Sequence, residues 1–209
     1  MVILTAAFTA AVKFVDVQPI GPEGTSVGLA SINAKFANFV GVNYTFYHIA
    51  EILGLVIIGI FLIFGFMGLV QLIKRRNLLK VDRNILVLGG MYFLVFALYV
   101  VFQKVVIDYR PVIMPGETMP EASFPSSHTM LAIVVLVGAM MQLKYYVKRK
   151  SARVILMADL IIIMVLTVAM RMFSGVHWLT DIVAGVLFSL TLIALYCAVL
   201  GGIENAAKH

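Results

Sequence analysis

Toward its C-terminus, the chain places an aspartate four residues after a histidine, a pair that could transfer protons or attack an electrophile. The residues are His177 and Asp181, in RMFSGVHWLTD. If a helix starts near Val176, the two side chains share one of its faces. The carboxylate then binds one ring nitrogen and directs the other outward, as a histidine nucleophile or general base requires. A structural His–Asp contact at a helix start is the alternative for this segment.

A second polar group stands at the start of an apolar run, in FPSSHTM, residues 124–130. Pro125 stiffens the approach, Ser126 or Ser127 can cap the helix that follows, and His128 comes next. The free N–H groups and the positive dipole end at the start of a helix bind anions. We therefore expect an anion site here, although an ordinary helix cap beside a surface histidine would use the same residues.

Three cations, Lys104, Arg110 and Arg171, lie outside the two basic segments of the chain. Together they could neutralise a multiply charged anion, and the planar guanidinium suits bidentate contact with phosphate. Their alternative role is to extend toward lipid head groups. With four histidines, one cysteine and no paired carboxylates nearby, the sequence predicts no metal, so neutralisation would come from side chains and a helix dipole.

The elements that position these residues are membrane helices. The chain has 209 residues, of which 62% are hydrophobic and 12% charged, far from the composition of a soluble domain. A span needs about 20 helical residues, and five stretches qualify: 52–73, 84–103, 124–143, 154–170 and 182–203. A sixth candidate, residues 1–17, is interrupted by Lys13 and Asp16. A signal peptide is its alternative, disfavoured because no positively charged segment precedes the apolar stretch.

The net charge of +6 reflects topology rather than a nucleic-acid partner, because ten of the sixteen basic residues lie in two short segments. These residues are Lys74, Arg75, Arg76, Lys80, Arg83, Lys144, Lys148, Arg149, Lys150 and Arg153. Basic loops face the cytoplasm, so six spans would put both termini inside and the polar groups described above at the external surface. We expect one domain over residues 1–209: an all-α, multi-pass membrane helical bundle of about six transmembrane helices in the cell membrane.

Two external segments connect these spans. Residues 18–47 are rich in Gly and Pro in their first half, which indicates a loop with a short helix over about Ala30–Val40. Residues 104–123 contain Pro111, Pro115 and Pro120, which argue against a continuous helix. The second segment leads directly into FPSSHTM, so three distant parts of the chain are expected to meet at one level of the membrane.

At these residues the sequence resembles the type 2 phosphatidic acid phosphatase family of membrane-embedded lipid phosphatases. Its signature is Lys, six residues, Arg-Pro; then Pro-Ser-Gly-His; then Ser-Arg, five residues, His, three residues, Asp. The resemblance covers a catalytic core from Lys104 to Asp181. Three departures stand out: five residues follow Lys104 before Arg110, Ser127 replaces Gly, and Met170 replaces Ser. The first rotates the lysine by about 100° on a helix.

The resemblance implies that His177 attacks phosphorus to form a phospho-histidine, while Asp181 orients it. His128 would protonate the leaving oxygen and then activate water. The phosphoryl oxygens would be held by Lys104, Arg110, Ser126, Ser127 and Arg171, with no cofactor or metal. From the residues alone, His177 is the better nucleophile because it has an acid four positions on and His128 has none.

A lipid phosphate within the bilayer is the expected substrate, because its tail can stay among the helices while its head group meets the cations. Leaving the hydrocarbon would cost about 0.8 kcal/mol per CH₂. A polyprenyl pyrophosphate such as undecaprenyl pyrophosphate, phosphatidic acid and phosphatidylglycerophosphate all fit. The competing class is a transporter or flippase of anionic lipids, which would call for polar groups or broken helices near the midplane.

Overall fold

A bundle of helices makes up the computed structural model, which describes residues 1–206. Its α-helices are α1 (Val2–Phe14), α2 (Ala30–Val40), α3 (Tyr44–Arg75), α4 (Arg83–Lys104), α5 (Ser127–Tyr146), α6 (Lys150–Phe173) and α7 (Leu179–Ala206). Within the described residues, extended pairing is limited to two isolated bridges, in the segments before α2 and before α5. The predicted all-α membrane fold is confirmed.

Five helices, α3 to α7, are long and apolar enough to cross a membrane. The sixth candidate, residues 1–17, instead forms the 13-residue α1, which is shorter than the roughly 20 residues that a span needs. The Thr5 hydroxyl of α1 meets the Leu187 carbonyl at 3.3 Å and the Thr191 hydroxyl at 2.8 Å. These contacts fix α1 against the first half of α7, so it is a short packed helix rather than a sixth full span.

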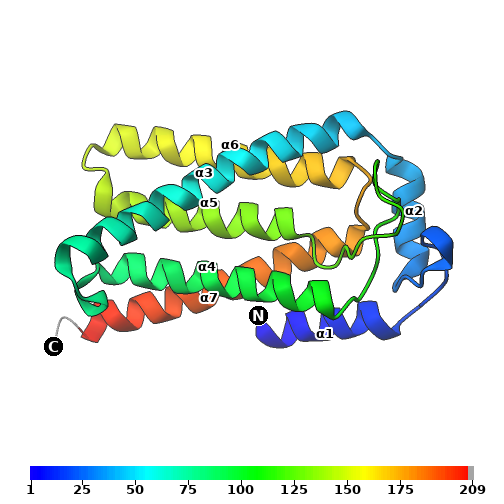
Figure 1. Ribbon diagram of the computed structural model, residues 1–209, viewed down its shortest axis with the longest axis horizontal. Helices are drawn as coiled ribbons and strands as arrows, with labels where there is room; N and C mark the ends of the chain where they lie inside the picture. The colour runs from blue at the N-terminus through cyan, green and yellow to red at the C-terminus, as the bar shows by residue number, and fades with distance from the viewer. Residues whose placement is uncertain (207–209) are drawn as a thin grey trace.

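The long helices run side by side along the long axis of the molecule (Figure 1). The two basic connections, after α3 and after α5, lie at the same end, at the left of the picture. At the other end, α2 and the segment between α4 and α5 lie across the tips of the helices. The polar residues singled out in the sequence therefore gather at the end opposite the basic loops, as the charge pattern predicts.

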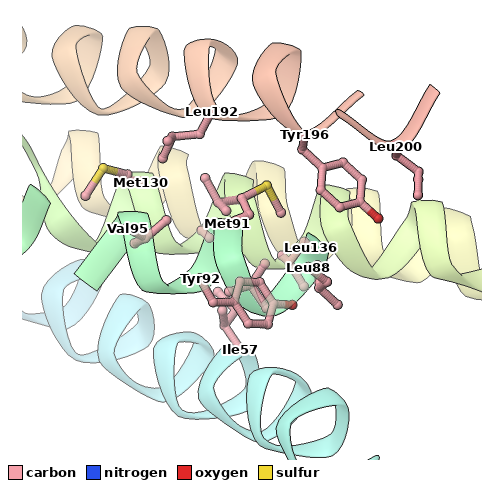
Figure 2. Close-up of a cluster of buried hydrophobic side chains, with 13 residues drawn as sticks. Ile57, Leu88, Met91, Tyr92, Val95, Met130, Leu136, Leu192, Tyr196 and Leu200 are labelled. Carbon is pink, nitrogen blue, oxygen red and sulfur yellow. The ribbon is translucent and has the colours of Figure 1, made fainter. Parts of the chain in front are cut away.

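The central helix is α5, which packs against α3, α4, α6 and α7. Half of the residues in its most apolar stretch are buried, against 6% to 33% in the other four spans. Figure 2 shows the side chains that fill the space around it, contributed by α3, α4, α5 and α7. They include Ile57, Leu88, Met91, Val95, Met130, Leu136, Leu192 and Leu200. Because lipid is as apolar as these residues, close packing rather than exclusion of water holds the helices together.

The α6–α7 turn docks tightly on the junction between α2 and α3. Gly175 has a φ of +68°, and a Cβ placed on it would lie 1.8 Å from the Gly41 carbonyl oxygen. Beside it, the Asn43 N–H donates to the Ser174 carbonyl at 2.9 Å. This contact fixes the turn that carries His177, two residues further on.

The two segments that were predicted to connect the spans at this end match the sequence-based expectations closely. The short helix expected over Ala30–Val40 is α2 with these same bounds, and the proline-bearing segment after α4 contains no α-helix. A helix start near Val176, which would put His177 and Asp181 on one helix face, is not observed, because α7 begins at Leu179. His177 is therefore in the turn before the helix and not on its first turn.

Gly175→Ala tests the docking of this turn. The new methyl group would meet the Gly41 backbone and force an L-residue into a left-handed conformation. We expect a loss of at least about 2 kcal/mol in the free energy of unfolding, measured by thermal or denaturant unfolding in detergent.

Gly59→Ala is the matched control, since a Cβ on this glycine of α3 meets nothing within 4 Å. Its unfolding free energy should stay the same or rise by about 1 kcal/mol, the helix-propensity gain. Equal stability of the two variants would contradict the tight docking of the turn.

Candidate active site

The turn before α7 presents His177 with one nitrogen held and the other directed at a cation. Its Nδ1 lies 3.2 Å from Asp181 Oδ2, and this same oxygen accepts the Trp178 N–H at 3.0 Å. His177 Nε2 lies 3.4 Å from an NH group of Arg110. The predicted His–Asp contact thus forms, but through a carboxylate that caps the turn rather than through two residues stacked on a helix.

Arg110 is held in place by the loop between α4 and α5. The Trp178 indole N–H donates to the Tyr109 carbonyl at 2.7 Å, which ties this loop to the turn that carries His177. Arg110 itself donates its backbone N–H to the Glu121 carbonyl at 2.9 Å. Its guanidinium Nε also pairs with the Glu121 carboxylate at 2.8 Å. Backbone and side chain together therefore fix the guanidinium beside His177.

The FPSSHTM segment forms the start of α5 and is bound to the start of α7. Ser126 is the N-cap residue, and its hydroxyl oxygen accepts the Thr129 N–H at 3.4 Å and the Thr129 hydroxyl at 3.0 Å. Its own N–H donates to the Asp181 carbonyl at 3.0 Å. A Cβ on Gly185 would lie 3.0 Å from the Ser126 carbonyl oxygen. The small residue lets the two helix ends approach, which brings His128 toward His177.

His128 lies in a second cluster, built with helices α3 and α6. Its Nδ1 accepts from the Arg171 guanidinium, and its Nε2 lies 3.2 Å from a carboxylate oxygen of Glu51. The same Glu51 oxygen pairs with Arg171 at 3.0 Å. Arg171 is fully buried and lies over the ring of Tyr47, 5.1 Å from its centroid. A buried cation needs such partners, because desolvation without them is costly.

A cavity of about 300 Å³ is lined by Arg110, His128 and His177 at the end of the bundle opposite the basic loops. Polar side chains of Arg110, Ser127, His128 and His177 face one part of it. Tyr99, Phe102 and Met130 supply apolar wall on the side of α4 and α5. Two imidazoles, one from the start of α5 and one from the turn before α7, thus share one cavity with a guanidinium, which can hold a small anion between a nucleophile and a proton donor.

Three of the predicted phosphate ligands, Lys104, Ser126 and Arg171, are not on the cavity wall. Lys104 is the exposed last residue of α4 and is not part of the cavity wall, whereas its neighbour Gln103 is. A lysine at position 103 would have the six-residue spacing to Arg110 that the family motif requires. Position 103 faces the cavity and position 104 does not, which is the rotation expected from the shortened motif. Ser126 is buried and its hydroxyl serves the helix cap, so Ser127 is the predicted serine that lines the cavity.

Glu51, Glu121 and Gln103 are site residues that the sequence-based prediction missed. Glu51 stands one residue before the predicted span 52–73, at the same end of the bundle as Arg110 and Arg171, and an acid at the edge of a span was the available signal. Glu121 lies in a proline-rich loop with no pattern that would pair it with Arg110. Within residues 1–206, no group of three potential metal ligands exists.

Burial favours the neutral form of the His177 imidazole. Desolvation lowers the pKa of His177 well below its ordinary value, and the positive charge of Arg110 lowers it further. The imidazole is therefore neutral near pH 7, with a lone pair available. In the loop before Arg110, burial raises the pKa of Asp108 to about 6, while a hydrogen bond from the Gly28 N–H opposes this rise.

Comparison with known proteins assigns the class to which this bundle and cavity belong. The family model of the PAP2 superfamily matches residues 84–202, which is more than half of the chain. The protein is a multi-pass membrane protein of the PAP2 superfamily. No curated protein sequence matches it.

One solved structure is similar over almost the whole chain: "Crystal structure of the first transmembrane PAP2 type phosphatidylglycerolphosphate phosphatase from Bacillus subtilis". The TM-score is 0.62 at 19% sequence identity, over 97% of this chain and 94% of that chain. This likeness shows that the transmembrane fold is shared. It includes helices outside the region that the family model matches.

Arg110→Gln tests the electrostatic coupling in the cavity. Removing the cation should raise the pKa of His177, because the charge that opposes its protonation is lost. The pH dependence of diethyl pyrocarbonate modification, followed by mass spectrometry of the peptide with His177, measures this pKa, since only neutral imidazole reacts.

Lys35→Gln serves as the control, because it removes one cation from α2 outside the cavity wall. It should leave the modification profile of His177 unchanged. A profile that also stays unchanged in Arg110→Gln would mean that Arg110 and His177 do not interact.

Proposed function

We propose that the protein is a membrane-integral phosphatase that removes a phosphate from a lipid through a phospho-histidine intermediate. The observation that carries this proposal is the cavity shared by His177, His128 and Arg110, in which His177 is held by Asp181. Membership in the PAP2 superfamily supports phosphatase chemistry. The similar solved structure is that of a phosphatidylglycerolphosphate phosphatase, which agrees with a lipid substrate.

In the first step, the lone pair on His177 Nε2 forms a bond to phosphorus, and the bond from phosphorus to the leaving lipid oxygen breaks. Asp181 holds Nδ1 and stabilises the positive charge that develops on the ring. His128 donates a proton to the leaving oxygen. Arg110, 3.4 Å from His177 Nε2, is placed to neutralise charge on the phosphoryl oxygens.

In the second step, water attacks phosphorus and the P–N bond breaks. His128 now takes the proton from water, since the group that gave a proton in the first step can accept one in the second. Inorganic phosphate and a regenerated His177 result. The neutral state of His177, which its low pKa maintains, returns the nucleophile without a further proton transfer.

The position of the cavity favours lipids over soluble phosphate esters. Tyr99 and Phe102 of α4 and Met130 of α5 form its apolar wall, and Tyr99 is partly exposed on the outside of the bundle. A lipid tail can lie along these residues while the phosphate meets Arg110 and Ser127. By the positive-inside rule, this end of the bundle faces outside, so the substrate is expected in the outer leaflet of the cell membrane.

A transporter of anionic lipids is less well supported. Met130 lines the cavity and also belongs to the packed apolar cluster beneath it, with Met91, Val95 and Leu192. This packing closes the bundle below the site. A transported head group would need polar residues along that route.

The substrate class is tested with purified protein in detergent and EDTA, on undecaprenyl pyrophosphate, phosphatidylglycerophosphate, phosphatidic acid and a soluble ester. Release of inorganic phosphate from at least one lipid, and about a thousandfold loss of that rate in His177→Ala, are expected. His48→Ala, which removes an exposed imidazole outside this cavity wall, should keep the rate within about threefold. Full activity of His177→Ala would exclude the phospho-histidine.

A separate prediction concerns the two cations nearest the first motif. Lys104→Gln should change kcat/KM by less than about threefold, because its side chain is not on the cavity wall. Arg110→Gln should lower kcat/KM by about a hundredfold, as loss of one donor to a developing oxyanion does. Steady-state kinetics on the preferred lipid measure both variants, and a larger loss for Lys104→Gln would show that the lysine reaches the phosphate.

A further inference from the structure

One face of α3 forms part of the site although this helix precedes the residues 84–202 that the family model matches. The face consists of Tyr47, Glu51 and Gly54, spaced by four and three residues and so aligned along the helix. Tyr47 covers the Arg171 guanidinium, and Glu51 pairs with it. A Cβ on Gly54 would lie 3.4 Å from the His128 ring, so the glycine leaves that ring its space.

Glu51 uses a single oxygen to contact two groups of the proposed phosphatase machinery. Its Oε1 lies 3.0 Å from Arg171 NH1 and 3.2 Å from His128 Nε2. A guanidinium and a protonated imidazole nitrogen are also the donors that a phosphoryl or leaving oxygen requires. The carboxylate oxygen thus has the surroundings of a substrate oxygen.

The hydrogen-bond network fixes the proton on His128. The Arg171 guanidinium can only donate, so Nδ1 of His128 accepts from it. The ring proton is then on Nε2, which lies 3.2 Å from the carboxylate oxygen of Glu51. Both ring nitrogens face protein groups in this arrangement, so one of these groups must move before His128 can contact a substrate oxygen.

Burial decides which partner can leave. The side chain of Arg171 is 0% exposed, whereas that of Glu51 is 38% exposed. A carboxylate cannot share these donors with a phosphate dianion, because like charges at such distances repel strongly. Glu51 is therefore the mobile partner.

We propose that Glu51 is a resident anion that occupies an oxygen position of the phosphoryl group and is displaced when substrate binds. The inference rests on the proposed phosphatase function and adds a determinant of specificity to it. A tetrahedral dianion can contact Arg110 as well as Arg171, and these additional contacts let it displace Glu51. A carboxylate on a lipid makes only the contacts that Glu51 already makes, so it does not displace this residue. After hydrolysis, the return of Glu51 would help inorganic phosphate to leave.

Glu51→Gln tests the displacement directly. The amide keeps the shape and an acceptor oxygen but removes the competing charge, so anions should bind more tightly. We expect the inhibition constants of orthovanadate and inorganic phosphate to fall by about tenfold, because less of the protein is held in the occluded state. They are measured in steady-state assays, with direct calorimetric titration of inorganic phosphate alongside.

Glu117→Gln is the matched control, since it removes the same charge from an exposed residue of the external loop outside the cavity wall. Its inhibition constants should stay within about twofold of wild type. An equal fall in both variants would mean that general electrostatics, and not displacement, sets the affinity.

Glu51→Ala gives a second readout that does not depend on turnover. Without the carboxylate, Arg171 lacks its counter-ion, so this variant should unfold at a lower temperature than wild type. Inorganic phosphate should raise its Tm by more than it raises that of wild type, because the added anion takes the vacated position.

Unchanged or weaker anion binding in Glu51→Gln would overturn the proposal. So would a loss of kcat of about a hundredfold with a shifted pH profile, which would make Glu51 a positioning residue for His128. Failure of the underlying function looks different: wild-type protein would neither hydrolyse a lipid phosphate nor bind vanadate. Wild-type hydrolysis with no change in anion affinity on Glu51→Gln would remove only the displacement.

Discussion

The site depends on one junction, at which the start of α5 is bound to the start of α7 through Asp181. The Asp181 carbonyl accepts the Ser126 N–H at 3.0 Å, and its carboxylate accepts the Trp178 N–H and contacts His177. Its backbone therefore locates the helix that carries His128, while its side chain orients the other histidine. Because the residue is fully buried, these contacts are shielded from competition with water. The geometry of both histidines follows from this one junction.

Charge compensation is the second constraint on the site. Each arginine near the cavity has a glutamate of its own, Arg110 with Glu121 and Arg171 with Glu51. Burying a guanidinium at the end of a membrane bundle costs free energy unless a partner is present. The glutamates supply that partner, and they also reduce the positive charge that an anionic substrate meets. An anion that contacts either guanidinium therefore competes with a carboxylate for it.

Much of the fold could be predicted because the membrane imposes simple rules on sequence. Five apolar stretches became α3 to α7, and the short helix α2 was predicted with its observed bounds. The segment 1–17 was harder, since its interrupted apolar pattern does not specify whether a helix crosses the bilayer or packs beside α7. The residue pairs that meet across helices were predictable only where a known motif connected them. Glu51 belongs to no such motif, and only the packing of α3 against α5 and α6 brings it to His128 and Arg171.

The sequence by itself determined the class of the molecule, the end of the bundle that carries the polar groups, and the histidines and arginines that could perform chemistry. These properties follow from hydrophobicity, loop charge and local spacing, which are all short-range in sequence. Only the tertiary structure decided that Gln103 rather than Lys104 faces the cavity, that Ser126 caps a helix, and that glutamates pair with both arginines. Those outcomes depend on helix rotation and on contacts between segments far apart in the chain, and no local pattern encodes them.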